Sequence, residues 1–262
     1  MSKYKIALIS ICLNQPYWIY QKAMIDSAKK FLLQGHEVEF LTWTDMPPEQ
    51  NLGHFIYPTQ SFEWPLPTLF RYHLFLKEEE KLKEYDYIFY CDTDMLFVAP
   101  VGNEILGDGL TAAQHPMYAL RREYLHPFEP NSQSTAHTPA TGRVVEKDGK
   151  KRFEPLYAAG GFQGGRTADF IEAMKVMKER IDEDFTNNYI SMWNDESHWN
   201  KYLSEHPPAV VLSPSYVYPD SLNKVYYQKL WGRNYVPRLI TLTKPFSLSK
   251  DGGVGLQQIL ST

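Results

Sequence analysis

Two aspartates one residue apart, Asp92 and Asp94, directly follow the strongest candidate for a buried strand in the sequence, Tyr85 to Cys91 (YDYIFYC). In open α/β sheets ligands bind beyond the carboxyl ends of the strands, so this D-x-D pair occupies a position where a ligand is expected. Carboxylates are hard oxygen ligands, suited to Mn²⁺ or Mg²⁺ bridging a substrate diphosphate. A solvated turn is the ordinary explanation of an acidic pair, but the preceding buried strand favours the metal and diphosphate interpretation.

A glycine-rich run, Ala159-Gly160-Gly161-Phe162-Gln163-Gly164-Gly165, is the second feature that indicates a ligand site. Glycine lets a backbone approach a ligand closely. The spacing does not match a dinucleotide G-x-G-x-x-G pattern, and the run does not lie at the first βα turn. A tight turn that packs a helix on a sheet is an equally good interpretation.

The third feature is Trp193-Asn194-Asp195-Glu196, at the expected start of a helix. Adjacent carboxylates and an indole suit sugar binding, and capping of the helix by Asp195 is the simpler alternative. His115 is an isolated histidine beside a turn, more often structural than catalytic. The sequence has no H-x-x-x-H pair for zinc and no G-x-S-x-G elbow of an α/β hydrolase.

These residues need an α/β framework to bring them together. The pattern predicts strands at 5–12, 37–43, 85–91, 156–162 and 209–212, and helices from about 16 to 32, 68 to 84, from 167 and from about 195. A loop is expected at 47–67, and residues 121–155 are expected to form a mobile excursion with a small hairpin at Asp148-Gly149. Strand–helix–strand order at the start implies a parallel sheet. With no repeat or linker, we expect a single domain.

The 262 residues carry a net charge of −4 and are 43% hydrophobic, which provides for a large core. Binding to nucleic acid or to an anionic membrane surface needs an excess of positive charge, so neither is expected. No apolar run is long enough to span a membrane. Cys12 and Cys91 both fall in apolar runs and suggest buried thiols in a reducing compartment. The cytoplasm, or the inner face of the membrane, is therefore the expected location.

Together the segments resemble glycosyltransferase family 6, the family of the histo-blood-group A and B transferases and α-1,3-galactosyltransferase. The matching segments are DSAKKFLLQGHEVEFLTWTD (26–45), TLFRYHLF (68–75), YDYIFYCDTDMLF (85–97), HPMY (115–118), YAAGGFQGG (157–165), MWNDESHWNKYL (192–203), LSPSY (212–216) and LTK (242–244). The resemblance implies a GT-A fold, with a Rossmann-like, mostly parallel sheet flanked by helices. It also implies retaining α-1,3 transfer of N-acetylgalactosamine or galactose from a UDP-sugar. By the same resemblance, we expect a member without the anchor and stem of the animal enzymes, as in bacterial relatives.

The resemblance also assigns roles to residues. Glu196 matches the catalytic carboxylate, and Asp92 and Asp94 match the metal site, which implies Mn²⁺, with Mg²⁺ as the alternative. The implied donor and nucleotide positions are Cys12, Asn14, Tyr17, Arg71, Asp92, Thr93, Asp94, Ala159, Gly160, Gly161, Asp195 and Lys244. The implied acceptor positions are His115, Trp193, Asp195 and Glu196.

The same resemblance divides the single domain into a nucleotide-binding half (1–98), an acceptor-binding and catalytic half (99–245) and a mobile tail (246–262). The expected acceptor is a galactoside, fucosylated as in the H antigen, on an oligosaccharide or a glycolipid. Gly161 stands where the A-type enzyme has glycine and the B-type alanine, which favours N-acetylgalactosamine as the donor sugar; a galactose-specific enzyme is the alternative. This chain departs from the family pattern at Asn194, where a histidine is usual, and it has no arginine after Lys244.

Two other classes of function are compatible with parts of the pattern. A haloacid-dehalogenase-type phosphatase also places D-x-D after a buried strand, but there the motif lies near the N-terminus. An inactive sugar-binding module would fit the 15% aromatic content, but it would not need Asp92, Asp94 and Glu196 together. Release of phosphate without UDP would identify the first, and binding without turnover the second.

Overall fold

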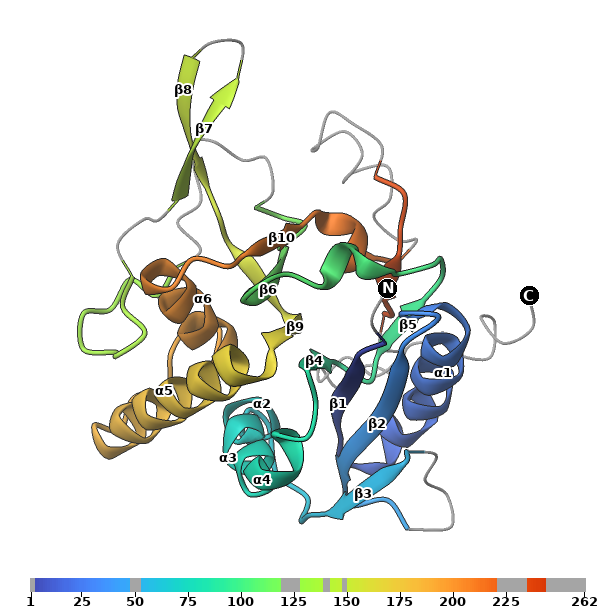
Figure 1. Ribbon diagram of the computed structural model, residues 1–262. Helices are drawn as coiled ribbons and strands as arrows, with labels where there is room; N and C mark the ends of the chain where they lie inside the picture. Colours follow the sequence, from blue (N-terminus) through green and yellow to red (C-terminus); the bar gives the residue numbers. More distant parts are fainter. Residues whose placement is uncertain are drawn as a thin grey trace.

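The computed structural model describes residues 3–47, 53–118, 128–138, 142–147, 150–220 and 235–243. A seven-stranded sheet in the order β10-β6-β9-β4-β1-β2-β3 forms its centre (Figure 1). The strands are β1 (Lys5–Cys12), β2 (Glu37–Thr44), β3 (Phe55–Pro58), β4 (Tyr87–Cys91), β6 (Leu110–Gln114), β9 (Ala158–Arg166) and β10 (Val210–Leu212). Only β9 runs antiparallel to its neighbours in this sheet, so the sheet is mostly parallel, as a GT-A fold requires.

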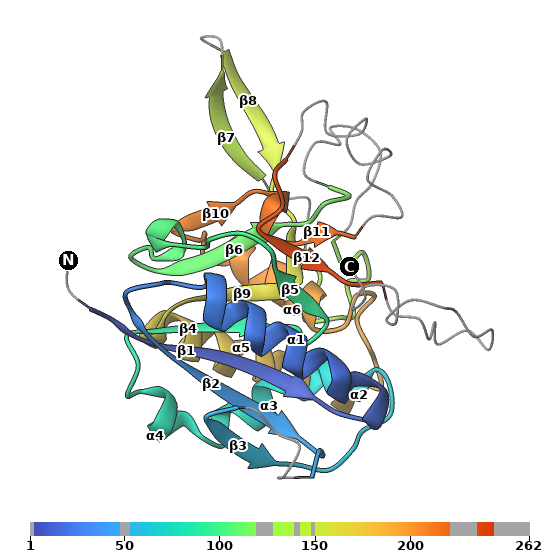
Figure 2. The same ribbon diagram turned by 90° about the vertical axis from the view of Figure 1, so that its right-hand side faces the viewer.

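Helices cover both faces of this sheet (Figure 2). One face is covered by α1 (Gln15–Phe31). The opposite face is covered by α2 (Leu66–Leu69), α3 (Arg71–Leu76), α4 (Glu79–Leu82), α5 (Thr167–Thr186) and α6 (Asp195–Glu205). The architecture is therefore a three-layer α/β fold.

Alternation along β1 shows how the sequence specifies these layers. Ala7 and Ile9 belong to the apolar core beneath α3, α5 and α6, while Ile6 and Leu8 belong to the core beneath α1. Successive strand residues point to opposite faces, so an unbroken apolar run is the pattern of a strand buried on both sides.

Two smaller sheets complete the described fold. A three-stranded sheet joins β5 (Met95–Phe97), just after the D-x-D pair, to β11 (Tyr218–Pro219) and β12 (Leu239–Thr241). A separate hairpin consists of β7 (Gly142–Lys147) and β8 (Lys150–Pro155), as expected around Asp148-Gly149. Short 3₁₀ turns occur at η2 (Asn103–Ile105) and η3 (Pro214–Tyr216).

Several elements differ from the sequence expectation. The helix predicted from 68 to 84 is three short helices, and Thr68 lies inside α2 and caps nothing, because its hydroxyl donates to the Pro65 carbonyl. The stretch 47–67 contains β3, and β9 extends through Gly164 and Gly165 to Arg166. α1 ends at Phe31, close to the predicted end at 32; the chain leaves the helix through Leu33 at a φ of 46°, and Gly35 follows at a φ of 98°.

The part of the chain that the structure describes contains no helix long and apolar enough to cross a membrane. Of the segment predicted to be mobile, residues 121–127, 139–141, 148 and 149 lie outside the described residues, as does the whole tail 246–262, and their mobility stays a prediction.

Candidate active site

A cavity of about 630 Å³ lies at the carboxyl edge of the central sheet, next to the ends of β1 and β4. Six of the predicted donor-site residues line it: Asn14, Tyr17, Arg71, Asp92, Thr93 and Asp94. Phe62 and Trp64, from the segment that leads into α2, and Thr68, in α2 itself, also line the cavity. Apolar walls and carboxylates at one end suit a nucleoside diphosphate with a metal ion.

Hydrogen bonds with neighbouring residues position both aspartates of the D-x-D pair. The Tyr90 hydroxyl donates to Asp92, and the Asp92 backbone N–H donates to the Gly161 carbonyl at 2.9 Å. Asp94 is 4% exposed, and its carbonyl accepts from the Leu242 N–H at 2.8 Å. The described residues contain no cluster of three or more metal-ligating side chains. The two carboxylates are therefore suited to a cation that completes its coordination with substrate oxygens.

Arg71 connects the D-x-D pair to the start of α6. Its guanidinium is buried, with Nη1 3.2 Å from Asp195 Oδ2 and Nη2 3.7 Å from Asp92 Oδ1, and it stacks on the Tyr90 ring at 4.2 Å. Burial alone would lower the pKa of Arg71, but the carboxylates of Asp195 and Asp92 raise it overall. The arginine therefore stays charged and offsets two acidic groups.

Asp195 does not cap α6, so the simpler interpretation of the sequence is wrong. It is the first helical residue, 4% exposed, and its carboxylate faces Arg71. Asn194 precedes it with a φ of 52°, an unusual backbone for a residue with a side chain. Burial raises the pKa of Asp195 to about 6, against the opposing effect of Arg71.

Glu196 meets the glycine-rich strand at Gly160, whose N–H donates to Oε2 at 2.7 Å. Burial raises the pKa of Glu196 to about 7, although the Gly160 N–H and the Tyr157 hydroxyl favour its charged form. A Cβ at Gly160 would lie 3.3 Å from the Cβ of Glu196, so glycine permits this close approach. A buried carboxylate with a pKa near neutrality is typical of a catalytic group, and Glu196 is connected to the cavity wall through its neighbour Asp195, which pairs with Arg71.

His115 and Trp193 are the two remaining residues that the resemblance assigns to the acceptor. His115 packs against Tyr157 with ring centroids 5.9 Å apart, and Tyr157 lies beside Glu196. Burial lowers the pKa of His115 to about 4, and its Nδ1 accepts from the Met117 N–H, so the imidazole is neutral with its hydrogen on Nε2. Trp193 is 46% exposed, a large apolar surface available to a ligand.

The other predicted positions within the described residues do not line this cavity: Cys12, His115, Ala159, Gly160, Gly161, Trp193, Asp195 and Glu196. Cys12 is fully buried, its thiol pKa raised to about 12 by burial, and Gly160 and Gly161 lie in β9 against Glu196 and Asp92. Ala159 is also buried, and the tight-turn interpretation of the glycine run is wrong because the run is a central strand. A Cβ at Gly164 would lie 2.2 Å from the Ile88 carbonyl oxygen. Lys244 lies outside the described residues.

Sequence reasoning missed several residues that shape the site. Tyr90 could have been found, because it lies two residues before Asp92 and strand periodicity places both on one face. Gln163 and Asn200 act through hydrogen bonds to β9 carbonyls, and nothing in a single sequence indicates such partners. Trp64 follows a stretch that looks like an ordinary loop.

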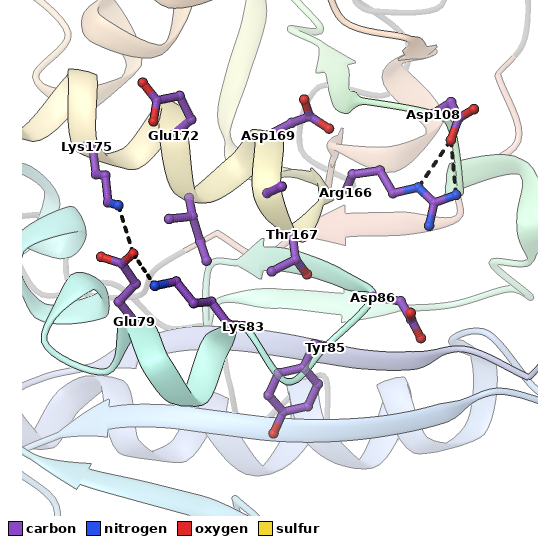
Figure 3. A pocket seen from close by; sticks show the side chains of 12 residues that line it. Glu79, Lys83, Tyr85, Asp86, Asp108, Arg166, Thr167, Asp169, Glu172 and Lys175 are labelled. Carbon is purple, nitrogen blue, oxygen red and sulfur yellow. Dashed lines mark hydrogen bonds and ion pairs between the residues drawn. The ribbon is translucent and has the colours of Figure 1, made fainter.

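A larger cavity, of about 740 Å³, lies at the opposite edge of the sheet (Figure 3). The basic residues on its wall are engaged with acids: Lys83 and Lys175 pair with Glu79, and Arg166 pairs with Asp108. It contains none of the predicted site residues. The smaller cavity, at the edge where α/β sheets bind ligands, is therefore the candidate site.

The fold and the site together define the class of a GT-A glycosyltransferase. Comparison with known proteins agrees, because the profile of Glycosyltransferase family 6 matches residues 71–230. The chain belongs to glycosyltransferase family 6.

Relatives in this family share about three residues in ten with this chain. Globoside alpha-1,3-N-acetylgalactosaminyltransferase 1 of Mus musculus is 31% identical over 214 residues, 78% of this chain and 58% of that protein. Histo-blood group ABO system transferase 1 of Rattus norvegicus is 31% identical over 216 residues, 79% and 59%. The O-antigen biosynthesis glycosyltransferase WbnI of Escherichia coli is 29% identical over 158 residues, 60% and 62%. The chain thus spans about three-fifths of the length of these relatives.

Proposed function

We propose that this protein transfers N-acetylgalactosamine from UDP-N-acetylgalactosamine to a galactoside, in α-1,3 linkage and with retention of configuration. The observation that carries the proposal is the cluster in which Arg71 joins the D-x-D carboxylate Asp92 to Asp195, directly before Glu196. In this cluster a single side chain, Arg71, connects the proposed diphosphate site to the proposed sugar-binding carboxylates. The names of the globoside and blood-group relatives support the reaction type.

The donor is proposed to occupy the cavity beside Tyr17 and the D-x-D pair. Asp92 and Asp94 would hold Mn²⁺, which supplies positive charge for the departing diphosphate. The Tyr17 ring offers an apolar face to the uracil, as the family resemblance implies. Asp195 Oδ2 is buried and lies 3.2 Å from Arg71 Nη1, and a hydroxyl of the donor sugar is proposed to bind the same carboxylate.

Glu196 is proposed to act on the anomeric carbon. As a carboxylate it either attacks C1 and forms a glycosyl–enzyme bond as UDP leaves, or stabilises a short-lived cation while the acceptor hydroxyl enters from the same face. The Gly160 N–H holds Oε2 in both schemes. The neutral His115 and the exposed Trp193 are proposed to receive the acceptor, a fucosylated galactoside.

Small side chains around the donor sugar support N-acetylgalactosamine over galactose. The family resemblance places Ala159, Gly160 and Gly161 near C2 of that sugar, where an acetamido group needs more space than a hydroxyl; in the structure Gly160 and Gly161 lie against Glu196 and Asp92. A roomy pocket also admits galactose, since one methyl group discriminates by only about 1–3 kcal/mol. The preference is therefore expected to be a ratio of rates and not an absolute exclusion.

The test is a donor panel of UDP-N-acetylgalactosamine, UDP-galactose, UDP-glucose and UDP-N-acetylglucosamine against fucosylated and unfucosylated galactosides, each with Mn²⁺ and with EDTA. We expect the highest kcat/KM for UDP-N-acetylgalactosamine with Mn²⁺ and a fucosylated acceptor. Preference for UDP-galactose would identify a galactosyltransferase instead. Binding of UDP and acceptor without turnover would identify an inactive sugar-binding module.

A further inference from the structure

Asn200, one turn after Glu196 in α6, joins this helix to β9 through all the polar atoms of its amide. Its Oδ1 accepts from the Ala158 N–H at 2.8 Å, and its Nδ2 donates to the Ala158 carbonyl at 2.8 Å. The same Nδ2 donates to the Glu196 carbonyl at 2.8 Å. Asn200 is 2% exposed, so these contacts are made away from water. The amide thus pairs with Ala158 as the residue of a neighbouring antiparallel strand would.

The next contact between β9 and α6 is made by Glu196 itself. Gly160 lies two residues after Ala158, on the same side of the strand, and its N–H donates to Glu196 Oε2. The Asn200 pair and the Glu196 bond are therefore successive links between one strand and one helix. Loss of the Asn200–Ala158 pair is therefore expected to change the position and rotation of α6 at Glu196.

The Gly160 carbonyl is held by two side chains, of which Arg71 also pairs with Asp195 at the start of α6. The carbonyl accepts from Gln163 Nε2 at 2.9 Å and from Arg71 Nη1 at 3.3 Å. Gln163 is held in turn by the Tyr72 hydroxyl, which donates to Oε1 at 3.1 Å. The strand is therefore held at the carbonyl of the residue whose N–H meets Glu196, and the position of α6 on the strand decides whether the Glu196 carboxylate reaches this N–H.

We propose that Asn200 is a positioning residue that holds the Glu196 carboxylate at its working place by fixing α6 on β9. The inference rests on the proposed function of Glu196. The asparagine side chain suits Ala158 because its amide offers an acceptor to the Ala158 N–H and a donor to the Ala158 carbonyl. An aspartate at 200 would place a negative oxygen against the Ala158 and Glu196 carbonyls.

The experiment compares Asn200→Asp and Asn200→Ala with Ser204→Ala. Ser204 is in the same helix, and its hydroxyl donates to the Lys201 carbonyl at 2.7 Å within the helix. We expect each Asn200 variant to lose about a hundredfold in kcat, the usual effect of a displacement of about 1 Å in a catalytic group. The Kd for UDP with Mn²⁺ should stay within about twofold, and Ser204→Ala should stay within about twofold in both quantities.

A double variant separates positioning from general damage. If Asn200 acts through Glu196, adding Asn200→Ala to the Glu196→Gln variant should lower kcat by less than about a further threefold. The effects of residues that act as a unit are not additive. Unchanged kcat in both Asn200 variants, multiplied losses in the double variant, or a parallel loss of UDP binding would each overturn the proposal. So would failure of both Asn200 variants to fold, judged by Tm, since the amide would then serve the fold alone. The single Glu196→Gln variant tests the proposed function separately: if it keeps full activity, the assignment of Glu196 fails first.

Discussion

Arg71 and Asp195 form a buried ion pair, with Nη1 3.2 Å from Oδ2, between two helices that are distant in the sequence. Both side chains are about 95% buried, and Asp92 lies 3.7 Å from the same guanidinium. The pair therefore places the start of α6, with Glu196, next to the D-x-D motif at the end of β4. An uncompensated charge at this position would be costly, so the cluster is only stable as a unit.

The first prediction concerns the stability of this cluster. Arg71→Met should lower the free energy of unfolding by about 3–5 kcal/mol, because it leaves Asp195 buried without a partner. Arg166→Met is the control, since its partner Asp108 is 92% exposed and the loss should stay within about 1 kcal/mol. Urea unfolding of both variants measures the difference. Equal losses would show that the buried pair contributes no more than a surface pair.

The second prediction follows from the raised pKa of Glu196. The folded protein keeps this proton up to a pKa of about 7, whereas an unfolded glutamate releases it near 4.5. The stability that Glu196 contributes is therefore full below pH 4.5 and is lost as the pH rises through 7, by a total on the order of 3 kcal/mol. Asp195, with a pKa of about 6, acts with the same sign.

Glu196→Gln should remove most of this dependence, so that the variant gains stability relative to the parent between pH 5 and pH 8. Denaturant unfolding at both pH values is the measurement. Glu205→Gln serves as the control in the same helix, because Arg180 and Lys201 outweigh the effect of burial and lower the pKa of Glu205, so its contribution is constant over this range. A parallel pH response of the parent and Glu196→Gln would contradict the prediction.

The sequence predicts the core of this fold well where one periodicity extends over a whole element. β1, α1, β2, β4 and α5 all lie within a few residues of their expected positions. The helical spacing of Phe170, Met174, Met177 and Ile181 gives α5 an apolar stripe, and all four side chains are buried. The region from 66 to 82 departs from the single predicted helix. It forms three short helices, and the buried side chains of the second include the charged Arg71, which apolar periodicity does not predict.

The site is predictable to a lesser degree, because its contacts join distant segments. D-x-D at the end of a buried strand is a local signal, and residues alone indicate it. The pairing of Arg71 with Asp195 and the bond from Gly160 to Glu196 depend on tertiary structure, and only the family resemblance placed these residues in one site. Glu129, Gln163 and Asn200 have neither a local signal nor a role in the resemblance.

The third prediction concerns the metal. Asp92→Asn and Asp94→Asn should each remove most activity and abolish the dependence of UDP affinity on Mn²⁺, since both side chains line the cavity at the expected diphosphate position. EDTA should have the same effect on the parent protein. Calorimetric titration of UDP with and without Mn²⁺ provides a readout independent of turnover. Asp108→Asn, an exposed aspartate at the other edge, is the control, and full activity in EDTA would refute metal dependence.

The fourth prediction assigns an effect to Glu129, a carboxylate that is 1% exposed. It accepts from the Met192 N–H at 2.5 Å and from the Tyr189 hydroxyl at 2.9 Å, and so fixes the loop that carries Trp193. Glu129→Gln cannot satisfy all these donors and should raise the acceptor KM about tenfold, while the KM for the UDP-sugar stays within about twofold. The exposed Glu179→Gln is the control, and an equal rise in both KM values would contradict a specific effect on the acceptor loop.

The last prediction concerns the choice of donor sugar and the difference between two adjacent glycines. A methyl group at Gly161 would lie 2.9 Å from Asp92 Oδ2 and 3.5 Å from the Met95 sulfur. Gly161→Ala should therefore shift the ratio of kcat/KM toward UDP-galactose, as the proposed A-type donor site requires, and also lower kcat/KM with both donors because Asp92 must move.

Gly160→Ala is the matched control, because its methyl group would lie 3.3 Å from the Glu196 Cβ and 3.4 Å from Asp195 Oδ2. This variant should lower kcat with both donors, because it disturbs Glu196 and Asp195, which the proposal assigns to every donor sugar. The ratio of kcat/KM between the two donors should stay within about threefold, because a methyl group at this position adds no discrimination at C2. Steady-state kinetics of the parent and both variants with the two UDP-sugars provide the comparison. If Gly160→Ala changes the ratio and Gly161→Ala does not, the side of β9 that faces α6 determines the donor, and the assignment of Gly161 is wrong.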